Sequence, residues 1–310
     1  MAECGENRTR RLFLRDLGWL AGGAAAAAAG LPAFAADEKP PDLAVVVGDD
    51  PKSMVKKAVA ELGGMKRFVS KGDVVVVKPN IAWVRRPETA ANTNPDVVAG
   101  LIEMAFDAGA KEIRVFDRTD RPPKDCYSTS GIAEAAQKLG AKIFYQTEMQ
   151  TVKFPLKNGV HLKEAVIAKY AVECDCFINV PVAKHHGSTK LTMTMKNHMG
   201  VAFEGTHDVW HASLHQAIAD FALHFKPKLN VLDAYRILVK RGPAGGSLED
   251  VQTPRKCIAG ADQAAVDAYG TTLFPMWAQK PTDIIHVAIA GKIGVGEVDL
   301  AKLRIREVSA

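Results

Sequence analysis

The fold class of this chain is decided by residues 73–80, which read DVVVVKPN. Four consecutive valines leave no polar side chain for either face, so the segment is predicted to be a strand buried on both sides. Such strands are typical of parallel sheets, in which crossover helices cover both faces. We expect the strand to end at Pro79 and Asn80, because proline has no backbone N–H to donate to a neighbouring strand.

The same style of pattern continues on both sides of this strand. Further apolar strands are predicted at 43–48, 112–117, 141–145, 176–180, 229–233 and 257–260. Helices are predicted at 52–68, 95–108, 131–139, 211–225, 263–273 and 282–290. Strands that alternate with helices in this way indicate parallel β–α–β units. We therefore predict an α/β fold with a mostly parallel sheet and helices on both faces.

The first 35 residues have the features of an export signal. Arg10 and Arg11 are followed closely by Phe13, as in a twin-arginine signal. The apolar run that follows is about 15 residues long, shorter than the roughly 20 that a spanning helix needs. Residues 33–35 read Ala-Phe-Ala, a cleavage site of the Ala-x-Ala type. An amphipathic helix is the alternative, but the six alanines at 24–29 leave it no polar face.

These features predict a precursor that is exported, to the periplasm or otherwise out of the cytoplasm, by the twin-arginine route. The partner is then the twin-arginine export machinery, which moves proteins that have already folded. After removal of the signal at 1–35, we expect no stable membrane anchor, because no further segment is apolar enough. Residues 36–310 are predicted to form a single α/β domain, with a segment rich in histidine and lysine at 184–215.

The charge of the predicted mature chain is close to balanced. The whole chain has 40 Lys+Arg and 35 Asp+Glu, of which residues 1–35 contribute four basic and three acidic side chains. The remaining net charge of +4 is too small for a dedicated nucleic-acid binder, so no nucleic-acid partner is expected. A charge of this size is compatible with small anionic ligands.

Four cysteines remain in the predicted mature chain: Cys126, Cys174, Cys176 and Cys257. No Cys-x-x-Cys pair or ferredoxin-like run is present, which disfavours an iron–sulfur cluster. Disulfides could form in an oxidising compartment, but free cysteines in apolar strands are the better expectation. The sequence also has no nucleotide-binding motif and no Gly-x-Ser-x-Gly elbow, so neither a nucleotide cofactor nor serine-hydrolase chemistry is indicated.

Polar residues that directly follow the predicted strands are candidates for a binding site. Open parallel sheets bind ligands beyond the carboxyl ends of their strands. The residues at these positions are Lys78, Asn80, Asp117, Arg118, Lys184, His185, His186 and Asp233. Lys78 is notable among them, because a lysine at the end of a buried strand needs either a partner or a cleft.

Histidines are concentrated in the 184–215 segment. Six of the nine lie there, at positions 185, 186, 198, 207, 211 and 215. His207, His211 and His215 are spaced by four, and His211 and His215 share one face of a helix that begins near Asp208. Neutral imidazoles in such pairs are common metal ligands. A divalent metal ion is therefore a candidate cofactor. The alternative is a solvated polar loop and helix face, since the spacing matches no standard zinc signature.

Residues 190–197, KLTMTMKN, alternate polar and apolar side chains. The alternation predicts a strand with Lys190, Thr192, Thr194 and Lys196 on one face. Two lysines and two hydroxyls on one face would bind a carboxylate or phosphate. A solvated edge strand, in which lysine is common, is the alternative interpretation.

Two acidic residues lie near the start of the predicted helix at 263–273. Asp262 is placed to cap its first turn. Asp267 falls inside the helix among apolar residues, where a carboxylate needs a lysine or a metal ion as its partner.

Several segments together resemble a known family. They are VKPN at 77–80, NP at 94–95, INVPVAKH at 178–185, TMTMKNHMG at 192–200, DA at 233–234 and GADQAAVD at 260–267. In these segments the sequence is similar to the domain of unknown function 362 family, from about residue 43 to about residue 274. Members often carry a ferredoxin-like iron–sulfur module, so the resemblance implies redox or cofactor-related work. This sequence lacks the cysteine runs of such a module.

The leading hypothesis is an enzyme that acts on a small anionic substrate in a cleft, assisted by a metal ion if the histidines bind one. The substrate-binding candidates are Lys78, Asn80, Lys184, Lys196 and Asn197. The catalytic candidates are His185, His186, Asp233 and Asp267, and the metal-ligand candidates are His207, His211 and His215. A non-catalytic metal- or anion-binding protein and an accessory protein to a redox system are the alternatives.

Overall fold

The valine strand lies inside a large sheet, as its sequence predicts. A computed structural model describes residues 39–148, 150–203 and 207–310, without the side chains of residues 148 and 207. In it, β2 (Val74–Pro79) pairs in parallel with β3 (Glu112–Phe116) on one side and β7 (Cys176–Val180) on the other. Residues 75–80 are all buried, because helices cover both faces of the strand.

The sheet is mostly parallel, which confirms the prediction. Its main path runs in the order β13 (Ile305–Ser309), β1 (Leu43–Val47), β12 (Lys256–Gly260), β10 (Leu229–Leu238), β7, β2, β3 and β4 (Lys142–Phe144). On this path β12 runs antiparallel to both of its neighbours, and the remaining pairs are parallel. A separate antiparallel pair, β5 (Thr151–Pro155) and β6 (Glu164–Ala168), lies beside the lower helices.

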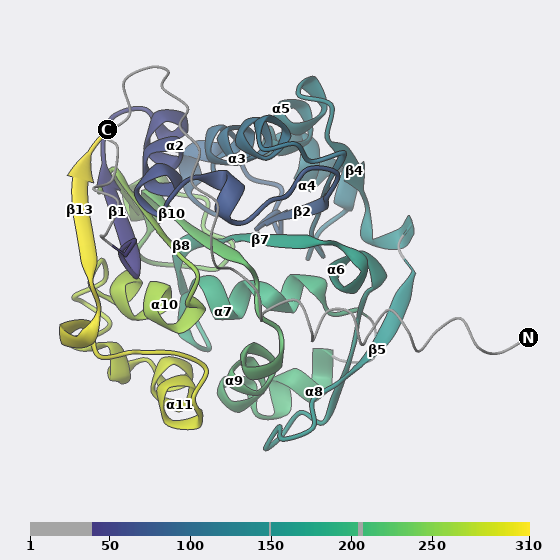
Figure 1. Cartoon of the computed structure of the whole chain (residues 1–310). Coiled ribbons are helices and arrows are strands. Elements are labelled where there is room, and N and C mark those ends of the chain that lie inside the picture. Colours follow the sequence, from purple (N-terminus) through teal and green to yellow (C-terminus); the bar gives the residue numbers. More distant parts are fainter. Residues whose placement is uncertain (1–38, 149, 204–206) are drawn as a thin grey trace, which may run out of the picture. The chain divides into compact units, whose positions relative to one another are not determined.

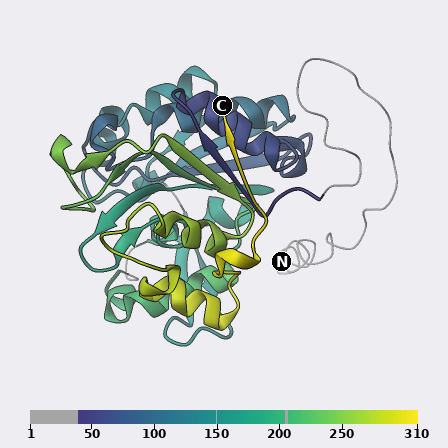
Figure 2. The ribbon, with the colours of Figure 1, turned by 90° about the vertical axis from the view of Figure 1, so that its left-hand side faces the viewer.

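Helices cover both faces of the sheet, as predicted (Figure 1). One layer consists of α2 (Pro51–Glu61), α3 (Pro95–Asp107), α4 (Pro123–Thr129) and α5 (Ile132–Lys138). The opposite layer contains α7 (Thr194–Asn197), α8 (His207–Ala212), α9 (Leu214–His224), α10 (Gln263–Thr271) and α11 (Ile285–Ile293), and α6 (Lys169–Glu173) joins β6 to β7. The view turned by 90° shows the same two layers on either side of the strands (Figure 2). Each layer encloses its own apolar core against the sheet.

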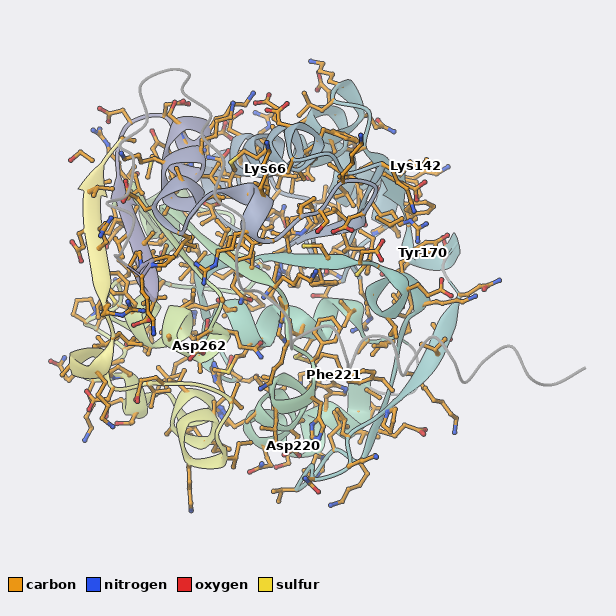
Figure 3. The ribbon with its side chains drawn as sticks, in the orientation of Figure 1. Lys66, Lys142, Tyr170, Asp220, Phe221 and Asp262 are labelled. Carbon is orange, nitrogen blue, oxygen red and sulfur yellow. The ribbon has the colours of Figure 1, made fainter. Side chains whose placement is uncertain are left out.

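Helix caps read from the sequence are present where they were expected. The Asn94 side chain accepts from Asp96 N at 3.0 Å, with Pro95 in the first turn of α3. Asp262 accepts from Ala264 N at 2.8 Å at the start of α10. In the lower layer, the buried Phe221 of α9 packs against neighbouring aromatic rings (Figure 3).

Three helix predictions were wrong in their extent. The helix predicted at 52–68 ends at Glu61, because Gly63 and Gly64 take φ values of 98° and 83°, and a short 3-10 turn follows (Met65–Arg67). The helix predicted at 211–225 is split at Ser213 into α8 and α9. The helix predicted at 282–290 begins only at Ile285, because the chain first makes a 3-10 turn at Pro281–Asp283.

The four cysteines of the described chain are free thiols. Cys176 and Cys257 are buried in strands, as expected, whereas Cys126 is buried in the helix α4. Cys174 is partly exposed. Residues 40–310 form one compact unit, and the predicted signal at 1–35 lies outside the described residues. In the part of the chain that the structure describes, no helix has the length and apolar character needed to cross a membrane.

Candidate functional site

The segment after β7 folds differently from its prediction. It forms β8 (Val182–His186) and the short β9 (Lys190–Thr192), and the chain then turns at Met193 into α7 rather than continuing as a strand. Asp267 fixes this turn, because its carboxylate accepts from Thr194 N at 2.6 Å and from Met195 N at 3.0 Å. The predicted single face of two lysines and two hydroxyls is therefore wrong: Lys190 is exposed, whereas Lys196 is 9% exposed.

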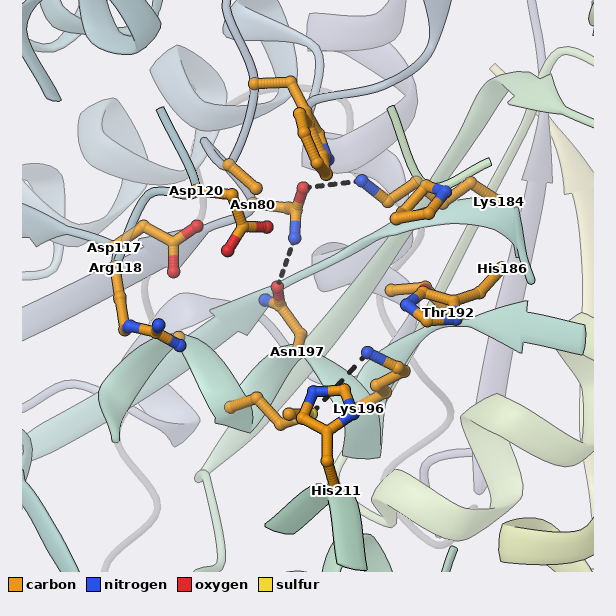
Figure 4. A pocket seen from close by; sticks show the side chains of 15 residues that line it. Asn80, Asp117, Arg118, Asp120, Lys184, His186, Thr192, Lys196, Asn197 and His211 are labelled. Atoms are coloured by element: carbon orange, nitrogen blue, oxygen red, sulfur yellow. Dashed lines mark hydrogen bonds between the residues drawn. The ribbon is translucent and has the colours of Figure 1, made fainter. Parts of the chain in front are cut away.

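A cavity of about 330 Å³ opens where these elements meet the carboxyl ends of β2 and β3 (Figure 4). It is lined by Asn80, Ala82, Trp83, Asp117, Arg118, Asp120, Lys184, His186, Thr192, Lys196, Asn197, Met199, Gly200, His211 and Pro243. Six of the predicted site residues are thus brought together: Asn80, Lys184, His186, Lys196, Asn197 and His211. This is the edge of the sheet at which an open α/β fold offers a ligand site.

Lys78 lies beneath the cavity rather than in its wall. Its ammonium group is fully buried and contacts Asp117 Oδ1 at 2.7 Å, Asn197 Oδ1 at 2.9 Å and the Pro79 carbonyl oxygen at 3.0 Å. Burial lowers the pKa of Lys78, and the adjacent Asp117 carboxylate opposes this effect. Because all three ammonium protons have acceptors, Lys78 is a structural cation that fixes the floor of the cavity.

Two asparagines connect this floor to the wall. Asn197 Oδ1 accepts from Asn80 Nδ2 at 3.2 Å, and Asn80 Oδ1 in turn accepts from Lys184 Nζ at 2.9 Å (Figure 4). Asn197 Nδ2 also donates to Asn179 Oδ1 at 2.8 Å. A buried amide in such a chain has its donors and acceptors committed, so the positions of Lys78 and Lys184 are coupled.

Lys184 and Lys196 are buried lysines that have no carboxylate within ion-pair distance among the described residues. Lys184 is 1% exposed and donates to Asn80 Oδ1 and, at 2.6 Å, to the carbonyl oxygen of Ala91. Lys196 Nζ has Met199 Sδ as its contact, at 3.6 Å. Among the described residues, neither lysine makes an ion pair. Burial and the charge of Lys196 lower the pKa of Lys184 to about 7, although the nearby carboxylates of Asp117 and Asp120 oppose this effect. Burial lowers the pKa of Lys196 to about 8, and Asp120 opposes it.

The two adjacent histidines of β8 differ in their surroundings. His186 lines the cavity, and its Nδ1 accepts from Ser188 N at 3.1 Å. Burial and the nearby lysines lower the pKa of His186 to about 2, so the ring is neutral and carries its proton on Nε2. His185 lies outside the cavity, with its ring 4.5 Å from that of Trp277 and its Nδ1 accepting from Gly242 N.

The two aspartates predicted to be catalytic lie away from the cavity. Asp233 accepts from Asn94 N at 2.7 Å and from Tyr235 N at 3.1 Å. Asp267 binds the backbone of α7 instead of the lysine or metal ion that we expected as its partner. Burial raises the pKa of Asp233 to about 6 and that of Asp267 to about 7. Both carboxylates thus hold backbone N–H groups in place.

The predicted metal ligands are only partly described. His211 lines the cavity, whereas the ring of His215 stacks on that of His286 at 5.8 Å. The side chain of His207 lies outside the described residues. Within residues 39–148, 150–203 and 207–310, no three His, Cys, Asp or Glu side chains gather closely enough to hold a metal ion. The metal-binding role of these histidines stays a prediction.

Sequence reasoning missed several groups that line the cavity. Arg118 and Asp117 were recognised as following a strand but were given no role, and Asp120 and Trp83 were not considered. Trp83 Nε1 and Thr192 Oγ1 are buried polar atoms without a hydrogen-bond partner among the described residues. Their signal in the sequence is weak, because Trp83 and Asp120 belong to irregular loops whose course depends on tertiary contacts.

Several known proteins are similar to this chain. A thylakoid-associated protein of Synechocystis sp. is 27% identical over 203 residues, which cover 61% of this chain and 60% of that protein. A protein of known structure from Thermotoga maritima matches with a TM-score of 0.45 and 12% identity over 74% of this chain and 60% of its own. The lactate racemase apoprotein from Thermoanaerobacterium thermosaccharolyticum gives a TM-score of 0.42 and 14% identity over 75% and 56%.

This chain therefore spans 60% or less of the length of each of these three proteins. The model of the family described as "Domain of unknown function (DUF362)" matches residues 75–272, which is more than half of the chain. The matched region contains every residue that lines the cavity. The chain thus belongs to the DUF362 family.

Proposed function

We propose that this protein is an enzyme that acts on a small anionic substrate bound in the cavity between Lys184 and Lys196. The observation that carries the proposal is that both lysines are buried and that neither has a carboxylate partner among the described residues. A buried cation without a direct ion-pair partner is costly unless a ligand supplies one. A bound anion would remove that cost, so the site is complementary to a carboxylate or phosphate.

Other donors support an oxygen-rich ligand. Arg118 lines the same cavity, and its guanidinium group has no ion-pair partner among the described residues. Trp83 Nε1 and Thr192 Oγ1 are polar atoms that a ligand oxygen would satisfy. A cavity of about 330 Å³ is at the lower end of the range for small-molecule sites, which favours a compact substrate.

Proton transfer is the chemistry that this site is best equipped to perform. The pKa of about 7 at Lys184 lets its amine exchange a proton near neutral pH. His186 is neutral and carries its proton on Nε2, so it is a hydrogen-bond donor for a negatively charged oxygen that develops during reaction. Asp120 adds an exposed carboxylate at the rim.

We also propose that residues 1–35 direct export by the twin-arginine route. The support is the sequence itself: paired arginines, a short apolar run and an Ala-x-Ala site in that order. A chain that is exported after it has folded would reach its compartment with the cavity already formed.

A thermal-shift screen of the mature protein with small carboxylates and phosphates tests the proposed function. We expect an anion to raise the melting temperature of the wild type and of Lys66→Met, because Lys66 is an exposed lysine that does not line the cavity. Lys196→Met should lose this shift while folding at least as well, since it removes a buried charge. Equal shifts in all three proteins would refute the proposal. Binding without turnover of any bound anion would indicate a carrier instead.

A further inference from the structure

We propose that Lys184 forms an imine with the carbonyl carbon of a small oxo acid, whose carboxylate is held by Lys196 and Arg118. This inference rests on the proposed function and names its substrate class. It follows from a difference in how the three buried lysines of this region are bonded.

The contacts of Lys78 suit an ammonium ion, whereas those of Lys184 suit a neutral amine. Lys78 Nζ has three oxygen acceptors, one of them the carboxylate of Asp117. Lys184 Nζ has two acceptors, the neutral oxygens of Asn80 and Ala91. A neutral amine has two N–H groups and a lone pair. When both N–H groups are donated to these oxygens, the lone pair is left for a ligand in the cavity that Lys184 lines.

Lys184 and Lys196 lie close to each other but differ in their surroundings, so we assign them different roles. Lys196 has a methionine sulfur as its contact and no anionic partner among the described residues, so it is the cation that a substrate carboxylate would neutralise. Lys184 is buried beside this charge, and a lysine that is desolvated next to another cation becomes an active nucleophile. Its pKa of about 7 means that a large part of the amine is unprotonated at neutral pH.

The reaction is balanced without an oxidant or reductant. The Lys184 nitrogen attacks the carbonyl carbon, a C–N bond forms, and one nitrogen proton moves to the oxygen to give a carbinolamine. The C–O bond then breaks, and the oxygen leaves as water after it takes up a second proton. Asp117 and Asp120 are carboxyl groups of the cavity lining, and Asp120, which is not paired with Lys78, can relay these protons. The protonated imine withdraws electrons from an adjacent C–H or C–C bond, which can then be broken.

Oxo acids fit the other features of the cavity. They pair a carboxylate, for Lys196 and Arg118, with a carbonyl oxygen that a neutral donor can polarise. Trp83 Nε1 and Thr192 Oγ1 lack partners among the described residues, and His186 carries its proton on Nε2. These groups could donate hydrogen bonds to the carbonyl oxygen of the substrate or to the hydroxyl oxygen of the carbinolamine.

Reductive trapping tests the inference. The mature protein is incubated with pyruvate, 2-oxobutyrate or acetoacetate and with sodium borohydride, and its intact mass and peptide masses are measured. We expect one adduct per chain, equal in mass to the oxo acid less one oxygen, on the peptide that contains Lys184. Malonate, an anion without a ketone, should compete with this labelling.

Variants separate the roles. Lys184→Arg should abolish trapping, Lys196→Met should reduce it by tenfold or more, and Lys66→Arg should leave it unchanged. Adducts confined to other lysines, or labelling that malonate does not reduce, would overturn the inference. Thermal stabilisation by malonate without any oxo-acid adduct would overturn the imine and leave the anion site standing. The absence of both anion binding and trapping would overturn both proposals. The adduct is located on the wild-type protein by peptide mass, so the test does not depend on the folding of any variant.

Discussion

At the residue scale, Gly200 sets the closest packing in the site. It lines the cavity and lies directly against the buried ion pair of Lys78 and Asp117. A Cβ atom at this position would be 1.9 Å from Asp117 Oδ1 and 2.5 Å from Lys78 Nζ. No side chain fits there unless the two charged groups move apart, so glycine is needed for close approach rather than for an unusual backbone angle.

Gly200→Ala should therefore destabilise the protein by about 3 kcal/mol, because it forces apart a buried ion pair. Urea unfolding of the mature protein measures the change. Gly187→Ala is the matched control, since a Cβ at Gly187 would meet nothing within 4 Å. If the two variants had the same free energy of unfolding, the ion pair could not be a rigid part of the cavity floor.

At the element scale, the short helix α7 carries Lys196 and Asn197 into the cavity, and Asp267 of α10 holds its first turn. Burial raises the pKa of Asp267 to about 7, above the usual 3.8 of an exposed aspartate. Between these two values the folded state binds a proton that the unfolded state has lost. The contribution of Asp267 to stability is thus present at low pH and is lost as the pH rises through about 7.

We expect Asp267→Asn to remove this component of the pH dependence. The free energy of unfolding of the wild type, compared with that of the variant, should fall as the pH rises from 4 to 7. Chemical denaturation at several pH values measures this difference, and Asp233→Asn serves as the comparison because burial raises the pKa of Asp233 only to about 6. A constant difference between wild type and Asp267→Asn across this range would contradict the argument.

Elements could be predicted from the sequence where local pattern and tertiary packing agree. The run of four valines at 74–77 alone predicts a central parallel strand, and Val75, Val76 and Val77 are buried as that prediction requires. Residues 194–197 keep the same alternation as residues 190–192, yet they form a helix. The difference comes from Asp267, whose carboxylate binds two backbone N–H groups more than 70 residues away in the chain. A period-two pattern cannot show such a contact.

At the scale of the whole molecule, the rule that ligand sites lie at the carboxyl ends of parallel strands brought together most of the lysine and asparagine candidates. Lys78, Asn80 and Lys184 were predicted in this way, and the structure joins them through hydrogen bonds. The rule applies only to residues at strand ends, so it does not predict that Trp83 and Asp120, which lie in loops, line the cavity. The rule also selected Asp233 as a site residue. Asp233 does not line the cavity, and its carboxylate accepts hydrogen bonds from the backbone N–H groups of Asn94 and Tyr235.

Export is a property of the whole precursor, and the paired arginines should control it. Replacing Arg10 and Arg11 by lysine should leave the precursor in the cytoplasm, because twin-arginine export depends on the guanidinium pair. Cell fractionation with immunoblotting measures the distribution. Replacing Arg8, outside the pair, is the control. Normal export of the double variant would rule out this route.

If Lys196, which is buried and has no ion pair among the described residues, holds a small anion, the affinity for that anion must depend on pH. Oxalate is titrated calorimetrically into the mature protein between pH 6.5 and 9.5, a range in which oxalate stays fully ionised. Lys196 has a pKa of about 8, so affinity should fall by roughly tenfold per pH unit above that value. Lys196→Arg should keep its affinity at high pH, because a guanidinium stays charged. Affinity that is absent, or unchanged across the range in the wild type, would contradict the account.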